Sequence, residues 1–223
     1  MIEELSCSIN TQNQKKYHFR GGRDMIPFPN KKYQIILADP AWSYNDKLGD
    51  FSKFANKNKS PKMGACEYYY NTLSIDDICN LPIKEISHKD CILFLWVTMP
   101  KLNECFKVIS EWGFKYKTCA FTWIKLNPKS GTIFKGIGRW VQGNAELCLL
   151  ATKGHPKRIS KSISQIIMAK RGRHSQKPDT VRKRIVELMG NLPRIELFAR
   201  GNKEKDMLGY NKFEGWDVWG NEV

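Results

Sequence analysis

The residues of this chain best suited to chemistry are Asp39-Pro40-Ala41-Trp42, which directly follow the apolar run 33–38. An apolar run that ends in an acid and a proline predicts a buried strand leading into a rigid turn, and open α/β sheets bind ligands at the carboxyl ends of strands. The exocyclic amine of a nucleic-acid base is a poor nucleophile, because its lone pair is delocalised into the ring. The Asp39 carboxylate and the Pro40 carbonyl could accept its two hydrogens while the Trp42 indole stacks on the base. The turn therefore suits methyl transfer to a base amine, although Asp-Pro turns also end strands in many α/β proteins without this chemistry.

Short apolar runs and amphipathic stretches alternate along the chain, and together they must position this turn. We expect strands over residues 33–38, 91–97, 116–124, 146–151, 165–168 and 195–198. We expect a short helix capped by Ser74, a helix opened by Pro100 and a helix over 178–189. The apolar stripe of the second helix would consist of Leu102, Phe106, Ile109 and Trp112. This alternation predicts an α/β fold with a mostly parallel sheet and helices on both faces.

Polar stretches mark the expected boundaries and loops. Residues 1–30 are polar and aperiodic and predict an N-terminal surface segment, and the absence of repeats or linkers predicts a single domain over 31–223. Two long polar stretches, 43–66 and 127–143, interrupt that domain. The first directly follows the Asp-Pro turn, so we expect it to be a mobile substrate loop.

The charge of the chain favours a polyanionic partner. Its net charge is +15, and the window 153–184 contains eleven lysines and arginines but one acid. Basic runs are often only solvated faces, yet such faces usually mix both signs. We therefore expect a nucleic-acid contact that weakens steeply with salt. The candidate contact residues are Lys153, Lys157, Arg158, Lys170, Arg171, Arg173 and His174.

Several function classes are disfavoured by the sequence. The seven cysteines form no Cys-x-x-Cys pair and the four histidines are dispersed, so we expect no metal centre. A dinucleotide-type Gly-x-Gly-x-x-Gly and a Gly-Lys-Ser/Thr phosphate loop are both absent from the sequence. No stretch resembles a membrane span or a signal peptide, and scattered cysteines suit a reducing compartment, so we expect a cytoplasmic protein.

Seven ordered segments of the chain resemble one enzyme family. Asp39-Pro40-Ala41-Trp42 resembles the Asp-Pro-Pro-Trp signature of the MT-A70 type adenine N6-methyltransferases, which are related to the seventy-kilodalton catalytic subunit of the mRNA adenosine methyltransferase. The likeness extends from about residue 32 to the carboxyl terminus and is closest to the compact bacterial and phage members. The other matching segments are 93–98, 112–116, 146–152, 174–178, 196–200 and 215–222.

The resemblance implies a Rossmann-like methyltransferase that uses S-adenosylmethionine to methylate the exocyclic N6 amine of adenine in nucleic acid, with DNA favoured over RNA. The family's permuted (β-class) motif order places the catalytic turn upstream of the cofactor strand. Asp39 and the Pro40 carbonyl would hold the amine, with Trp42 against the base. Relatives act alone or with a paralogous subunit, so a homodimer and a paralogous partner both stay open. The implied cofactor-binding residues are Asp39, Ser175, Lys177, Phe198, Arg200, Asn202, Asn221 and Glu222.

Ala41 is the main departure from the family pattern, because it replaces the second proline of the signature. A proline restricts the residue before it to extended conformations, so that proline would fix the Pro40 carbonyl. Two alternatives follow. The chain could be a catalytically silent, nucleic-acid-binding partner subunit, or it could methylate adenine in RNA.

Overall fold

A seven-stranded sheet forms the centre of the computed structural model, with the strand order β7-β5-β6-β4-β3-β8-β9. The structure describes residues 8–9, 15–16, 27–43, 73–138, 140–172, 176–199, 211 and 213–220. A separate two-stranded antiparallel pair joins β1 (Ser8–Ile9) and β2 (Lys15–Lys16). The predicted substrate loop over 43–66 lies outside the described residues, apart from Ser43.

The predicted strands are all present, and six of the seven strands run in the same direction. Only β6 is antiparallel to its neighbours, β4 and β5. The mostly parallel sheet is therefore confirmed, and β9 is a strand that the sequence did not predict. The strands are β3 (Tyr33–Ala38), β4 (Ser87–Val97), β5 (Lys115–Leu126), β6 (Ala145–Lys153), β7 (Ile166–Lys170), β8 (Arg194–Leu197) and β9 (Asp217–Trp219).

The described helices are α1 (Ile75–Cys79), α2 (Ile83–Ile86), α3 (Leu102–Glu111) and α4 (Thr180–Met189), with a 3-10 turn, η3 (Met99–Lys101), before α3. The predicted Ser74 cap is confirmed, because Ser74 and Asp77 form a reciprocal capping box. Pro100 lies in the 3-10 turn and does not open the α-helix itself. The predicted stripe of α3 was partly wrong: Phe106 is 41% exposed and packs edge-on against Tyr116, while the buried helical residues are Cys105, Val108 and Ile109.

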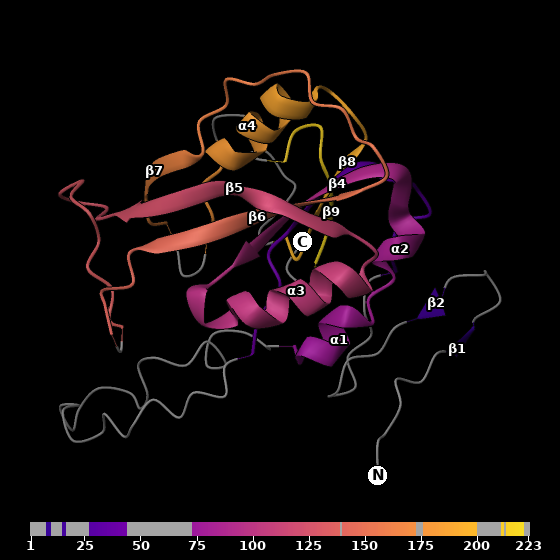
Figure 1. Ribbon diagram of the computed structural model, residues 1–223, viewed down its shortest axis with the longest axis horizontal. Coiled ribbons are helices and arrows are strands. Elements are labelled where there is room, and N and C mark those ends of the chain that lie inside the picture. The colour runs from indigo at the N-terminus through magenta and orange to yellow at the C-terminus, as the bar shows by residue number, and fades with distance from the viewer. Residues whose placement is uncertain are drawn as a thin grey trace, which may run out of the picture.

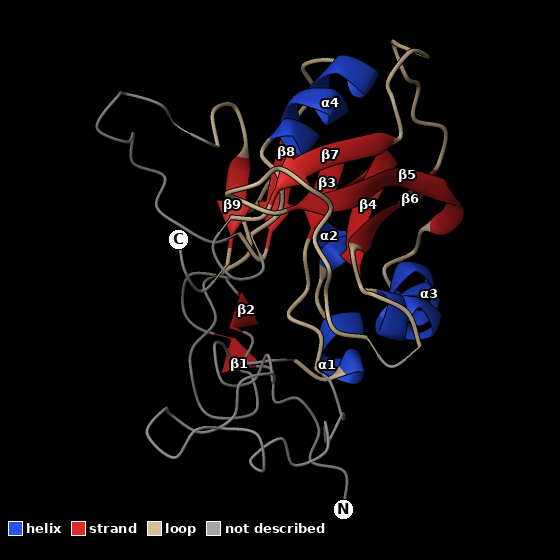
Figure 2. Ribbon diagram, turned by 90° about the vertical axis from the view of Figure 1, so that its left-hand side faces the viewer, coloured by secondary structure: helices blue, strands red, loops and turns tan. Residues whose placement is uncertain are grey.

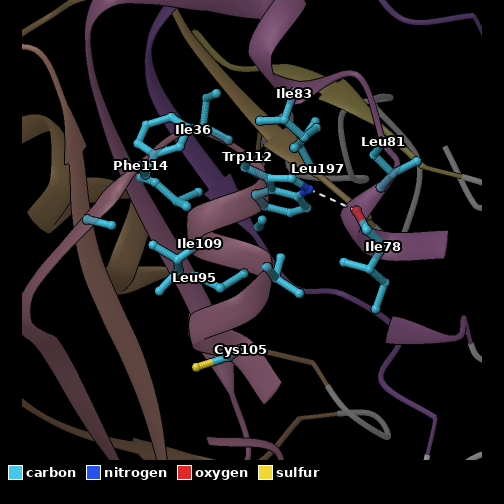
Figure 3. Close-up of a cluster of buried hydrophobic side chains, with 14 of the residues drawn as sticks. Ile36, Ile78, Leu81, Ile83, Leu95, Cys105, Ile109, Trp112, Phe114 and Leu197 are labelled. Atoms are coloured by element: carbon cyan, nitrogen blue, oxygen red, sulfur yellow. Dashed lines mark hydrogen bonds between the residues drawn. The ribbon is translucent and has the colours of Figure 1, made fainter. Parts of the chain in front are cut away.

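Helices cover both faces of the sheet, as Figures 1 and 2 show. On one face α1, α2 and α3 pack in the cluster that contains Ile78, Ile83 and Val108, and on the other α4 packs through Val181 and Ile185. In the first cluster the Trp112 indole N–H donates to the Ile78 carbonyl at 2.8 Å (Figure 3). This bond satisfies the one polar group of a fully buried ring.

The described cysteines are free thiols that pack in or against the core. Burial raises the pKa of both Cys91 and Cys105 to about 12, so these two thiols are not activated nucleophiles. Among the described helices, none is both long and apolar enough for a membrane crossing.

Candidate functional site: the crevice between β3 and β8

The chain changes direction across the sheet at the boundary between β3 and β8. These strands are parallel neighbours, with Ala38 paired to Leu197. After β3 the chain continues to β4 on one side, and after β8 it continues to β9 on the other. In α/β proteins ligands bind at the carboxyl ends of the strands at such a topological switch, and we call this place the β3–β8 crevice. The first residues beyond the strands are Asp39 and Phe198, so both lie at this crevice.

Three hydrogen bonds hold the turn after β3. The Trp42 backbone N–H donates to the Pro40 carbonyl at 2.9 Å, and the Leu73 N–H donates to the Ala41 carbonyl at 2.8 Å. The Trp42 indole N–H donates to the Trp96 carbonyl at 3.1 Å. Because the turn is bonded to β4 and to the segment before α1, its geometry does not depend on a second proline.

Trp42 has a packing role in this structure. Its side chain is 4% exposed and belongs to the core cluster on the face covered by α1–α3. The sequence analysis predicts that this ring stacks on the base. In the structure the ring is buried, and its N–H has an acceptor on β4. Stacking of Trp42 on a base stays a prediction.

Four alternating charges lie along the carboxyl edge of the sheet. The Lys177 ammonium donates to both oxygens of Asp39, at 2.8 and 2.7 Å. It also lies 3.4 Å from Oε2 of Glu146, whose Oε1 accepts a hydrogen bond from Lys125 at 2.6 Å. These side chains are between 12% and 19% exposed. We call Asp39, Lys177, Glu146 and Lys125 the charge row.

The groups of the charge row stabilise one another's ionised forms. Burial by itself would lower the pKa of the Lys177 ammonium, but the negative charges of Asp39 and Glu146 and the hydrogen bonds to Asp39 raise it well above its usual value. Burial by itself would raise the pKa of Glu146, but Lys177 and Lys125 lower it overall. Lys177 and Glu146 therefore stay charged at neutral pH.

The end of β8 has an unusual backbone. Phe198 has φ 61°, in the left-handed region that residues other than glycine rarely adopt. Its ring lies edge-on to Trp219 at 5.5 Å, and Trp219 stacks on Phe28 at 4.2 Å. A Cβ at Gly220 would lie 2.5 Å from the Ala199 carbonyl oxygen, so glycine is required where the ends of β8 and β9 meet. Strained backbone of this kind clusters at ligand-binding sites.

Comparison with known proteins identifies the family. A family model described as MT-A70 matches residues 33–222. The chain belongs to the MT-A70 family.

Named relatives of this MT-A70 protein include one of similar length and several much longer ones. It is similar to the type II methyltransferase M.MunI of Mycoplasma sp, with 35% identity over 204 residues that cover 87% of this chain and 79% of that protein. It is 27% identical over 194 residues to the N(6)-adenosine-methyltransferase subunit METTL3 of Danio rerio, and 26% identical over 194 residues to the catalytic subunit METTL3 of Homo sapiens. Each of these two matches covers 86% of this chain but 28% of METTL3, so the chain spans little more than a quarter of those proteins.

The structure brings together some of the residues expected from the MT-A70 resemblance. Asp39, Pro40, Ala41, Lys177 and Phe198 lie at or beside the crevice. Two members of the charge row, Glu146 and Lys125, were missed by the sequence analysis. Glu146 carries a weak signal, because it is the one acid of β6 and directly precedes the apolar run 147–151. The other expected cofactor-binding residues lie outside the described residues: Ser175, Arg200, Asn202, Asn221 and Glu222.

The antiparallel strand β6 divides the predicted basic contact surface between two edges of the sheet, and its contact with nucleic acid stays a prediction. Lys153 ends β6 opposite Cys91, at the beginning of β4, whereas β6 begins at the edge that carries Asp39. A nine-residue strand separates those ends by about 26 Å. Lys153, Lys157 and Arg158 therefore lie toward the edge of the sheet opposite the crevice.

The remaining basic candidates follow β7, which runs parallel to β5. Lys170 pairs with Leu126 at the carboxyl edge, the same edge as the crevice. The Arg171 guanidinium lies 3.4 Å from the centre of the Phe134 ring. Arg173 and His174 lie outside the described residues. Of the described candidates, only Lys170 and Arg171 lie at the same edge of the sheet as Asp39.

Proposed function

We propose that this protein transfers a methyl group from S-adenosylmethionine to the exocyclic N6 amine of adenine in DNA. As a member of the MT-A70 family it is an adenine methyltransferase. The DNA substrate is supported by the likeness to the type II methyltransferase M.MunI over most of both chains and by the net charge of +15. Cysteines that are free thiols suit a reducing compartment, so we propose that the protein acts in the cytoplasm.

The single observation that carries this proposal is the Asp39–Lys177 ion pair at the β3–β8 crevice. The amino-acid end of S-adenosylmethionine has one ammonium and one carboxylate, and the ion pair offers a complementary charge for each. Lys177 would hold the carboxylate and Asp39 would approach the ammonium, with Phe198 at the crevice wall. Bound there, the cofactor would supply an activated methyl group on a sulfonium. We propose that Ser175, Arg200, Asn202, Asn221 and Glu222 complete its site.

The order of the elements supports the permuted methyltransferase arrangement. The catalytic turn follows β3, and β8, which we propose as the cofactor strand, comes about 160 residues later in the chain yet pairs directly with β3. The two halves of the site therefore meet at one edge, as a Rossmann-like methyltransferase requires.

The catalytic turn would activate the amine by accepting its hydrogens. The Asp39 carboxylate would accept one N–H of adenine and the Pro40 carbonyl the other, which localises the lone pair on nitrogen. Pro40 has capacity for this, because a carbonyl oxygen has two lone pairs and the Trp42 N–H occupies one. The displaced proton would leave to solvent or to Asp39.

A duplex adenine must leave the base stack to reach this turn, at a cost of a few kcal/mol. Lys170 and Arg171 lie at the same edge of the sheet and would contact the phosphates beside the flipped base. Binding to phosphates by these residues would account for part of the expected salt dependence.

Two measurements test the proposed function. Isothermal titration with S-adenosylmethionine should give binding to the wild-type protein that Lys177→Met weakens by at least about tenfold, because the substitution removes a charged partner. Transfer from labelled S-adenosylmethionine should be faster to DNA than to RNA of matched sequence. Faster transfer to RNA would overturn the DNA assignment, and cofactor binding without transfer to either polymer would instead indicate a silent partner subunit.

A further inference from the structure

In this structure Lys177 competes for the oxygens that the proposed reaction needs. Both Asp39 oxygens accept hydrogen bonds from the Lys177 ammonium, at 2.8 and 2.7 Å. A carboxylate held by a buried cation is a weaker acceptor for a neutral amine. Each Asp39 oxygen keeps a second lone pair, but release of one oxygen by Lys177 would make Asp39 a stronger acceptor for an N–H of the substrate.

Glu146 offers Lys177 a second place to bind. Its Oε2 atom is buried, has no hydrogen-bond partner among the described residues and lies 3.4 Å from Lys177 Nζ. A lysine ammonium has three donors on a rotatable stem, so a small displacement would complete this hydrogen bond. Because the Glu146 and Lys177 side chains are 12% and 13% exposed, solvent screens their attraction weakly.

Two neighbouring side chains, Lys125 and Trp96, contact Glu146 and Lys177. Lys125 donates to Oε1 of Glu146 at 2.6 Å, so the glutamate has an anchor on β5. The Lys177 ammonium lies 5.7 Å from the centre of the Trp96 ring, and aromatic faces attract cations. The Trp96 ring therefore attracts the Lys177 ammonium whether that ammonium is bonded to Asp39 or to Glu146.

We propose that Glu146 is a positioning residue, which accepts one N–H of the Lys177 ammonium so that one oxygen of Asp39 is released for the substrate amine. Because the ammonium has three donors, another N–H stays available for the cofactor carboxylate. This inference rests on the proposed function. It requires no proton or electron transfer, only the exchange of one hydrogen bond of Lys177 from Asp39 to Glu146. The charge row stays neutral throughout, because two carboxylates and two ammonium groups are present before and after the exchange.

The test compares Glu146→Gln with the wild-type protein in single-turnover methyl transfer. The amide keeps the shape of the side chain and can still accept from Lys125, but it lacks the charge that draws Lys177 from Asp39. We expect the transfer rate to fall by about 10- to 100-fold, the size of effect that misplacement of a reacting group produces. The dissociation constant for S-adenosylmethionine should change by less than about threefold, since Lys177 itself is retained.

Two further variants separate positioning from folding. Glu196→Gln removes a carboxylate of equal exposure, 12%, whose partner is Arg182 on α4, and should leave the transfer rate within about twofold of wild type. Glu146→Asp keeps the charge and should give a rate between those of wild type and Glu146→Gln, and it preserves the test if the glutamine variant does not fold.

The outcomes distinguish this inference from the proposed function. Wild-type protein that transfers no methyl group would overturn the proposed function itself. An active wild type with a folded Glu146→Gln variant of equal transfer rate would overturn only the role of Glu146. An equal loss of rate in Glu196→Gln would also overturn it, because the effect would then belong to any buried carboxylate.

Discussion

Ala41 stands where the family signature has a second proline, and the contacts around it explain how the turn keeps its form. Hydrogen bonds from the Trp42 and Leu73 N–H groups hold the Pro40 and Ala41 carbonyls. The Trp42 indole ties the same turn to β4 through the Trp96 carbonyl. Each bond of this kind contributes about 1 kcal/mol, so three together replace much of the restraint that a proline ring would add.

Ala41→Pro should therefore change activity little. We expect kcat to change by less than about threefold and the unfolding free energy to rise by up to about 1 kcal/mol, because proline restricts the unfolded chain. Kinetics with labelled S-adenosylmethionine and chemical denaturation measure the two effects. A tenfold gain in kcat would contradict our account of the turn, because it would mean that the hydrogen bonds leave the turn loose.

Glu146 should also govern part of the acid sensitivity of the fold. Its pKa in the folded protein is lowered from 4.5, because Lys177 and Lys125 outweigh the effect of burial. Its contribution to stability is therefore present above about pH 4.5 and is lost as the pH falls through the lower folded value. Wild-type protein should lose stability more steeply than Glu146→Gln below pH 4.5 in thermal melts from pH 3 to 7. Parallel curves for the two proteins would refute this assignment.

At the scale of elements, the hydrophobic pattern predicted most of the sheet, since β3, β4 and β6 each contain an apolar run. β9 escaped prediction because it has only three residues, Asp217–Trp219, and its pairing with β8 is a long-range contact. The buried face of α3 includes Cys105 and Val108 in place of Phe106, whose ring packs against Tyr116 and is 41% exposed. Local sequence indicates where a strand or helix forms, but tertiary contacts decide which of its residues are buried.

The strand directions also decide which basic residues lie beside the proposed site. Lys170 ends β7 at the edge that carries Asp39, whereas Lys157 follows the end of β6 toward the opposite edge. The sequence window 153–184 could not reveal this division, because it depends on β6 being antiparallel.

Lys170→Ala and Lys157→Ala are a matched pair of exposed charge removals. Lys170→Ala should weaken DNA binding severalfold and reduce the slope of log K against log salt by about 0.9, the value for one lost phosphate contact. Lys157→Ala should leave both quantities close to wild type. Fluorescence anisotropy at several salt concentrations measures them, and an equal effect of the two substitutions would show that DNA contacts both edges.

Over the whole molecule, the topology of the sheet brings together site residues that are far apart in the sequence. Asp39 and Lys177 are 138 positions apart, yet they form the ion pair at the β3–β8 crevice. Asp39 and Lys177 could be predicted through the MT-A70 motifs. Glu146 and Lys125 could not, since a single acid or lysine in a strand gains meaning only when neighbouring strands place it beside Lys177.

The most direct test of the central claim is the identity of the methylated atom. Wild-type protein and Asp39→Asn are incubated with S-adenosylmethionine and unmethylated plasmid DNA, and the digested nucleosides are resolved by mass spectrometry. Wild-type protein should yield N6-methyl-2′-deoxyadenosine, and a folded Asp39→Asn variant should yield it at least about 100-fold more slowly, because the turn has lost its charged acceptor. Methylation of another atom, or an Asp39→Asn rate equal to wild type, would contradict the assignment of the β3 turn as the amine site.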